Sequence, residues 1–293
     1  MNLPASSVSG ALPSIDGGEA VDFGAAIQAF MLAQLRQIDD QLGERRHPHR
    51  AIHEVRKAVR RFRSMLALCV DVSPKRFDAL DKRVRRVGKR LSALRDAHVL
   101  VGTAASVRRR DGREAIWLAL DLWLRRERRQ LLDSALADDP EFAVLRRRAV
   151  RAARALAGID FSGLGGKAVV RALRASAAEM AKAEQKASEH PRAAIRHRWR
   201  RRVRRLRLQL EGLAAIGEDA LLPIAVRIEA QWVLSEALSS VPSAAALAVL
   251  ADRLGERQDV ENLAVRVKRH DELPHREDIL AALKARQGPR RAQ

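Results

Sequence analysis

The sequence predicts an all-α protein made of two helical bundles, and three observations lead to this fold class. Ala, Leu and Arg dominate the chain, and apolar residues recur at spacings of three and four, which is typical of amphipathic helices. No convincing segment alternates apolar and polar residues as a half-buried strand would. One cationic segment also occurs twice, 144 residues apart, which indicates an internal repeat covering about half the chain per unit.

The helical pattern divides the chain into ten expected helices joined by short breaks. They are expected at 19–43, 49–72, 74–109, 113–136, 140–157, 167–188, 191–216, 219–239, 243–270 and 274–287. Prolines are tolerated in the first turn of a helix, and six of them stand at or near proposed helix starts: Pro48, Pro74, Pro140, Pro191, Pro242 and Pro274.

The breaks in the pattern predict how the chain is organised. Residues 1–18, rich in Ser, Gly and Pro, are expected to form a flexible leader. The segment GIDFSGLGG, residues 158–166, interrupts the helices with four glycines and is expected to link two halves. The first bundle then covers 19–157, the second covers 167–287, and 288–293 form a tail.

The overall charge points to a polyanionic partner. The 293 residues carry a formal net charge of +20, and 47% of them are hydrophobic, so the chain can fold and is not a disordered basic tail. A surface this cationic repels itself unless a polyanion is close. Nucleic acid, an anionic membrane surface and an inorganic polyanion are the candidate partners.

Other features place the protein in the cytoplasm. The single cysteine, Cys69, excludes an intrachain disulfide and falls on an apolar helical stripe, so we interpret it as a core residue. The N-terminal residues lack the basic and apolar regions of a signal peptide. No apolar run reaches the roughly 18 residues that a membrane span needs.

The repeated segments are AIHEVRKAVRRFRSML, residues 51–66, and IRHRWRRRVRRLRLQL, residues 195–210. Their apolar positions match as well as their charges, for example Val59 with Val203 and Phe62 with Leu206. The matched polar positions are His53, Arg56, Lys57, Arg60, Arg61 and Arg63 in the first copy, and His197, Arg200, Arg201, Arg204, Arg205 and Arg207 in the second.

On a helix, these polar residues form one broad cationic face opposite an apolar face. Like charges four residues apart, such as Arg56 and Arg60, destabilise a helix unless something neutralises them. Most charge runs are simply solvated faces. Here the sequence accepts the repulsion twice at matched positions, histidine included, which favours an anion-binding site.

A second pair of segments also matches. LSALRDAHVL begins at Leu91 and LGERQDVENL begins at Leu254, so that Asp96 corresponds to Asp259, 163 residues later. We expect both aspartates to pair with nearby arginines and fix their conformation, without acting as catalysts.

The helix before Asp96 carries another cationic stripe, made of Lys82, Arg85, Arg86 and Lys89. The matching region of the second half is nearly uncharged, so a solvated face and a ligand contact are equally compatible with this stripe. We retain Arg85 and Lys89 as candidate ligand residues.

These residues resemble the CHAD family, whose name refers to conserved histidines in an α-helical domain. The resemblance rests on the pattern His-x-x-Arg-(Lys/Arg)-x-x-Arg-Arg-x-Arg at 53–63 and 197–207, and on the segments at 91–96 and 254–259. It implies two antiparallel four-helix bundles with pseudo-twofold symmetry, and non-enzymatic binding of inorganic polyphosphate in a basic groove or channel between them. It further implies that the matched residues contact phosphates and that the protein is targeted to polyphosphate granules. Ser92 stands where glycine is common in the family.

Nucleic-acid binding is the main alternative, since the charge alone fits it. The chain has six Phe, four Trp and no Tyr, and Trp117, Trp123, Trp199 and Trp232 all fall at expected core positions, which leaves few exposed aromatic residues for stacking on bases. Nonspecific binding to duplex DNA at low salt remains an expectation.

Enzymatic, metal-binding and membrane-surface roles are less well supported. In HEVRK, residues 53–57, a lysine replaces the second histidine of a zinc-protease motif. His47, His49 and His53 could place imidazoles together, but no acidic or cysteine cluster accompanies them, so we expect no metal and no cofactor. We also find no paired catalytic carboxylates or phosphate-binding loop. The apolar stripes are better explained as bundle core than as a membrane-facing surface.

Overall fold

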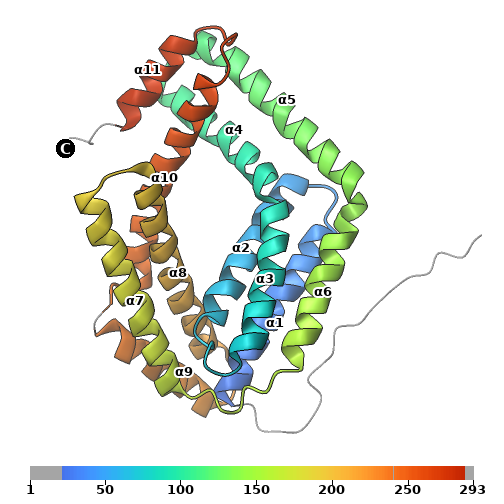
Figure 1. The fold of residues 1–293 in the computed structure, drawn as a ribbon, viewed down its shortest axis with the longest axis vertical. Helices are drawn as coiled ribbons and strands as arrows, with labels where there is room; N and C mark the ends of the chain where they lie inside the picture. The colour runs from blue at the N-terminus through green and yellow to red at the C-terminus, as the bar shows by residue number, and fades with distance from the viewer. Residues whose placement is uncertain (1–21, 240, 288–293) are drawn as a thin grey trace, which may run out of the picture.

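The computed structural model describes residues 22–239 and 241–287, and over these ranges it is helical with no strand (Figure 1). The predicted all-α class is therefore confirmed. The expected leader at 1–18, the first residues of the expected first helix and the tail at 288–293 lie outside the described residues. The helices are α1 (Phe23–Leu42), α2 (Pro48–Leu66), α3 (Pro74–Arg90), α4 (Ser92–Asp111), α5 (Glu114–Asp138), the short 3₁₀ helix η1 (Pro140–Phe142), α6 (Ala143–Ala157), α7 (Gly166–Glu189), α8 (Ala193–Glu218), α9 (Ile224–Leu238), α10 (Ala244–Lys268) and α11 (Arg276–Gln287).

The helices pack in three groups. In the first group α1 packs on α2 and α6, and α3 packs on the same two helices. In the second group α8 lies against α7, α9 and α10. The hairpin of α4 and α5 extends away from the first group and meets α10 and α11 at the end of the molecule opposite α9 (Figure 1).

Two hydrophobic cores correspond to this arrangement. The main core is continuous across both halves of the chain, running from Phe23 in α1 to Ala251 in α10. The second core lies under the α4–α5 hairpin and includes Trp117, Leu263 and Leu283, which are at most 1% exposed. Each half of the chain therefore contributes side chains to each core. The domain boundaries and the pseudo-twofold relation remain predictions.

The contact between α2 and α8 joins the halves at the centre. The fully buried Gln209 of α8 donates its amide to the backbone oxygen of Ser64, at 3.2 Å. A Cβ at Gly212 would lie 2.5 Å from the Sδ of Met65, so glycine is what allows the two helices to approach this closely. This contact sets the two repeated motifs beside each other.

The expected single helix at 74–109 is wrong, because the chain breaks at Leu91. Arg56 of α2 donates to the backbone oxygen of Gly88, and the Ser92 hydroxyl donates to the same oxygen at 3.1 Å. Side chains that engage a helical carbonyl in this way commonly kink a helix. The break separates α3 from α4 and turns α4 towards the second half.

The expected helix at 49–72 ends earlier than predicted, at Leu66. Residues 67–72 form tight turns with hydrogen bonds between residues three apart, such as Cys69 N–H to Leu66 O. Pro74 disfavours a helical conformation at Ser73, which adopts φ −155° and ψ 77°. The chain thereby reverses into α3.

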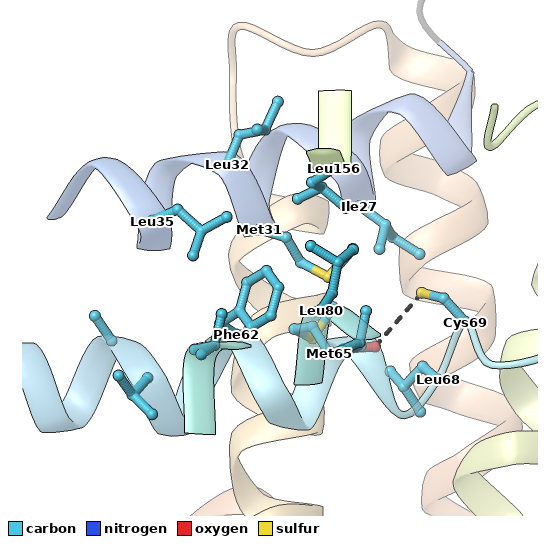
Figure 2. Close-up of a cluster of buried hydrophobic side chains, with 14 of the residues drawn as sticks. Ile27, Met31, Leu32, Leu35, Phe62, Met65, Leu68, Cys69, Leu80 and Leu156 are labelled. Atoms are coloured by element: carbon cyan, nitrogen blue, oxygen red, sulfur yellow. Dashed lines mark hydrogen bonds between the residues drawn. The ribbon is translucent and has the colours of Figure 1, made fainter. Parts of the chain in front are cut away.

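Cys69 lies in the main core, as the sequence predicts. Figure 2 shows its thiol among Ile27, Met65 and Leu68, donating to the backbone oxygen of Met65 at 3.4 Å. Burial raises the pKa of this thiol far above its ordinary value, which keeps it protonated and unreactive.

The tryptophans follow the core prediction only in part. Trp117 is 1% exposed, and its indole donates to Asp111 at 2.9 Å. Trp123 and Trp199 are half-buried, and Trp123 packs its ring edge-on against His270. The core prediction is wrong for Trp232 of α9, which is 41% exposed. Its ring packs over Gly166, the first residue of α7, and does not reach the interior.

Candidate functional site

The two repeated motifs place their central arginines together. Arg60 of α2 and Arg204 of α8 are half-buried where these helices meet. Burial, together with the Arg204 and Arg56 guanidinium groups, lowers the pKa of Arg60 to about 9. Burial, together with Arg200 and Arg95, lowers the pKa of Arg204 to about 10. Both shifts follow from burial and from the closeness of other guanidinium groups.

We call these residues the central arginine cluster: Arg56 and Arg60 from α2, Arg95 from α4, and Arg200 and Arg204 from α8. Burial also lowers the pKa values of Arg56 and Arg200. The Nε–H groups of three members are buried and have no hydrogen-bond partner among the described residues: Arg56, Arg95 and Arg200. The cluster therefore offers buried donors that the chain itself does not use.

Arg56 and Arg200 are each held by the segments that the sequence also pairs. Arg56 donates to the Ser92 hydroxyl at 2.9 Å. Arg200 donates to the Gln258 side chain at 2.9 Å, and its guanidinium lies so close to Gly255 that a Cβ there would be 2.4 Å from Nη2. Ser92 and Gly255 are separated by the same 163 residues as the two aspartates.

Two aspartates balance part of this charge. Asp96 lies 3.2 Å from Arg95, and Asp259 lies 4.0 Å from Arg200, so both pair with arginines as predicted. Burial raises the pKa of Asp259, although Arg200 and Arg95 oppose the rise. Two carboxylates beside five guanidinium groups leave the cluster with an excess of positive charge.

Three other motif residues are paired with carboxylates. Arg63 forms a two-pronged ion pair with Asp81 of α3, at 2.6 and 3.0 Å. Lys57 lies 3.0 Å from Glu54, and Arg207 lies 3.3 Å from Glu211. Their charges are partly neutralised within the chain, and the Arg63–Asp81 pair also ties α2 to α3.

The remaining cationic candidates differ in exposure. Arg61 and Arg205 are half-buried, and burial followed by the nearby Arg202 lowers the pKa of Arg205. Arg201, Arg85 and Lys89 are exposed. At 100° per residue, Arg85 and Lys89 lie on the flank of α3 that also carries Asp81, the partner of Arg63. These two therefore lie on the side of α3 that meets α2 through Arg63, and among the described residues neither forms a hydrogen bond or ion pair with the central arginine cluster.

The predicted stripe on α3 is not one surface. Arg86 projects with Arg83 from the opposite flank, towards α6, where both line a cavity with arginines of that helix. The four stripe residues span about 100° of the helix surface, so Arg85 and Arg86 at its two edges meet different neighbours.

The two motif histidines are half-buried. Burial is the largest influence on His53 and lowers its pKa; Glu54 raises it, and Arg60, Lys57 and Arg95 lower it further. The Nδ1 atom of His197 is buried without a hydrogen-bond partner among the described residues.

His49 packs against a second histidine and not against the further ligands that a metal site would need. Its ring stacks on His98 of α4 with centroids 5.4 Å apart, and Arg128 of α5 lies 3.4 Å from His98 Nδ1. Burial, Arg128 and His98 lower the pKa of His49 to about 4. Within 22–239 and 241–287, no three His, Cys, Asp or Glu residues come together as a metal site.

Sequence reasoning did not identify Arg95. Its side chain is 20% exposed, and it acts on the pKa values of Arg60 and Arg204, one from each motif copy. The internal repeat does not point to this residue, because the matching position in the second half is Gln258. Its position directly before the matched Asp96 was the available signal.

Comparison with known proteins identifies the family of this all-helical chain. The CHAD domain profile matches residues 29–268. The chain belongs to the CHAD domain family.

Two solved structures share the fold. One is described as PptA from Streptomyces chartreusis: it has 16% sequence identity and a TM-score of 0.59, over 90% of this chain and 93% of that one. The other is the CHAD domain from the plant Ricinus communis, with 21% identity and a TM-score of 0.57, over 96% of this chain and 93% of that one. None of the curated proteins compared matches the sequence. Each helix within the described parts of the chain is too short or too polar to cross a membrane.

Proposed function

We propose that the protein binds inorganic polyphosphate at the central arginine cluster without hydrolysing it. The CHAD domain family is associated with polyphosphate. The observation that carries the proposal for this chain is the meeting of five arginines from α2, α4 and α8, three of them with buried, unpartnered Nε–H groups. Guanidinium groups match phosphate oxygens in charge and in two-pronged geometry.

The electrostatics of the cluster favour a polyanion. In the free protein, burial and neighbouring guanidinium groups lower the pKa values of both Arg60 and Arg204, although both side chains stay protonated at neutral pH. A phosphate chain placed beside them replaces repulsion by attraction and fills the unused donors. The same charges that destabilise the free protein therefore stabilise its complex with a polyanion.

The other motif residues extend this path in our proposal. Lys57, Arg61, Arg63, Arg201, Arg205 and Arg207 flank the cluster along α2 and α8, and Arg85 and Lys89 add exposed charge on α3. The carboxylates nearest the cluster, Asp96 and Asp259, are engaged by arginines, which supports a binding role over activation of water. We further propose that binding places the protein on polyphosphate granules in the cytoplasm.

A titration with long-chain polyphosphate tests this proposal. The double variant Arg60→Gln, Arg204→Gln removes the two central charges, and we expect it to bind at least about tenfold more weakly, since one lost charged hydrogen bond is worth roughly 1.5–3 kcal/mol. The control Arg109→Gln, Arg110→Gln removes the same charge from exposed positions at the end of α4. We expect it to bind within about twofold of the unchanged protein, because a distant surface charge contributes mainly a screened long-range attraction.

Competition with duplex DNA of equal phosphate content separates the two main alternatives. A dedicated polyphosphate site predicts that DNA competes poorly near physiological salt. Equal binding of DNA, with the same loss in both double variants, would show a general cationic surface and overturn the proposal. Circular dichroism confirms that each variant is folded.

A further inference from the structure

A second cationic site lies on the other flank of α3. A cavity of about 360 Å³ between α3 and α6 is lined by five residues, all of them arginine: Arg83, Arg86, Arg148, Arg151 and Arg154. All five come from the first half of the chain, and none belongs to the repeated motif. The α6 sequence, AVLRRRAVRAARALA, contains no acidic residue that could neutralise them.

Three other cations on the same two helices have partners within the chain. Arg146 of α6 pairs with Asp39 at 2.9 Å, and Lys82 of α3 pairs with Asp78 at 2.6 Å. Arg76 donates to the backbone oxygen of Gly158 at 3.1 Å. Among the described residues, the side chains of the five arginines of the cavity form no ion pair and no hydrogen bond. Their charge is therefore available to an external anion.

An adjoining cavity has a different chemistry. It has a volume of about 480 Å³, lies between α3, α4, α5 and α6, and includes Arg148, which also lines the first cavity. Its walls combine apolar residues, Leu94, Leu131, Ala135 and Leu145 among them, with the charged residues Arg90, Asp138, Asp139 and Arg148. The exposed carboxylate of Asp138 borders it and has no ion-pair partner among the described residues.

We propose that the two adjoining cavities bind one ligand that joins an oligophosphate to a nucleoside. The five arginines attract several phosphates, whereas the neighbouring carboxylate repels them and accepts hydrogen bonds from the amino group of a base. The apolar walls suit the faces of an aromatic ring system. A nucleoside triphosphate has both a phosphate end and a base end. Arg148 lines both cavities and marks the point where the two ends join.

This site is separate from the central arginine cluster. None of the five arginines belongs to the cluster, and at 100° per residue Arg83 and Arg86 project from α3 about 160° and 140° away from Asp81, the partner of Arg63. The proposal therefore does not depend on polyphosphate binding at the cluster, and the two can be tested separately.

The test is calorimetric titration of the full chain with ATP, tripolyphosphate and adenosine, in buffer containing a chelator so that the phosphates keep their charge. We expect ATP to bind more tightly than either part alone. The variant Arg151→Gln, Arg154→Gln changes two exposed arginines that have no partner in the chain, so we expect it to remain folded and to bind ATP at least about tenfold more weakly. Arg109→Gln, Arg110→Gln is the charge-matched control, and we expect it to keep ATP binding.

A second variant tests the apolar half of the site. Ser134 is exposed on α5 and lines the larger cavity, so Ser134→Trp fills the cavity from its surface. We expect it to weaken ATP binding while leaving tripolyphosphate binding unchanged. Tripolyphosphate binding as tight as ATP, with no effect of Ser134→Trp, would overturn the proposal of a composite site. Equal losses in the two arginine double variants would overturn the site itself. The Arg60→Gln, Arg204→Gln variant should still bind ATP, whatever its polyphosphate affinity.

Discussion

At the scale of single residues, the protein uses the same side chain in two ways. Arg63 is neutralised by a two-pronged ion pair with Asp81, whereas Arg60 is surrounded by other arginines that lower its pKa to about 9. An arginine of the first kind supports the fold. An arginine of the second kind destabilises the free protein and gains from a bound anion.

His53 gives a pH-dependent prediction. Its pKa in the free protein is lowered, chiefly by burial, so the ring is neutral at pH 7. A bound phosphate chain would raise this pKa, so binding takes up a proton and affinity rises as pH falls from 8 to 5.5. The gain is limited to about tenfold for each pKa unit by which the complex exceeds the free protein. Polyphosphate titrations at these pH values measure it.

The variant His53→Gln provides the control for this prediction. It keeps a polar side chain that cannot titrate, so we expect its affinity to change less with pH than that of the unchanged protein. Affinity that is independent of pH between 5.5 and 8 in the unchanged protein would remove the proposed role of His53.

The sequence indicates which residues the structure brings together in the candidate site, but not how each is paired. The matched positions lead to Arg60 and Arg204, because helical periodicity puts them opposite the apolar stripe. The ion pair of Arg63 depends on Asp81, which another helix supplies. Arg95 joins the cluster because the chain changes direction at Leu91, where α4 begins. The spacing of apolar residues does not predict that change.

At the scale of helices, the break between α3 and α4 helps to position Arg56, and the close packing of α10 helps to position Arg200. Ser92 accepts a hydrogen bond from Arg56, and Gly255 leaves room for Arg200. Helix periodicity predicts both helices, yet it does not reveal the break, because the apolar stripe of α3 continues through Leu91 and Leu94. The competing hydrogen bonds at Gly88 O, which involve a side chain from another helix, decide it.

Replacing Gly255 by alanine should separate stability from binding. Alanine favours a helix over glycine by roughly 0.5–1 kcal/mol, but a Cβ at this position would lie 2.4 Å from Arg200 Nη2 and displace the guanidinium. We therefore expect Gly255→Ala to weaken polyphosphate binding without unfolding the protein. Titration and thermal melting measure the two effects.

Gly102 provides a matched comparison within α4. A Cβ there would meet no atom within 4 Å. We expect Gly102→Ala to raise stability by roughly 0.5–1 kcal/mol and to leave binding unchanged. If both alanine variants bind equally well, the position of Arg200 does not matter for the ligand.

At the scale of the whole molecule, excess charge links stability to ligand and salt. The net charge of +20 destabilises the compact state through self-repulsion. Polyphosphate at about 100 times its dissociation constant should stabilise the protein by roughly 2.7 kcal/mol. The accompanying rise in melting temperature should shrink steeply as salt increases, because binding releases counterions.

Thermal melts at several salt concentrations, with and without polyphosphate, check this expectation. Salt alone should raise the melting temperature of the free protein modestly by screening its charges. A ligand-induced shift that is unchanged between 50 mM and 500 mM salt would contradict an electrostatic site.

The all-α class could be predicted from the sequence because periodicity and composition are local properties. The division into halves at 158–166 describes the order of residues along the chain. The packing, by contrast, depends on contacts between the two halves. Trp117 packs with Leu263 and Leu283 although nearly 150 residues or more separate them, and no local pattern indicates that pairing.

The two cores have a consequence for the integrity of the chain. Gly163 and Gly165, in the segment between α6 and α7, have open space around them. A protease that cut the backbone there would leave two fragments still joined by the α2–α8 contact and by the second core beneath α4 and α5. Packing between the halves therefore holds the folded molecule together in addition to the peptide connection, and we expect a nicked molecule to remain a single particle.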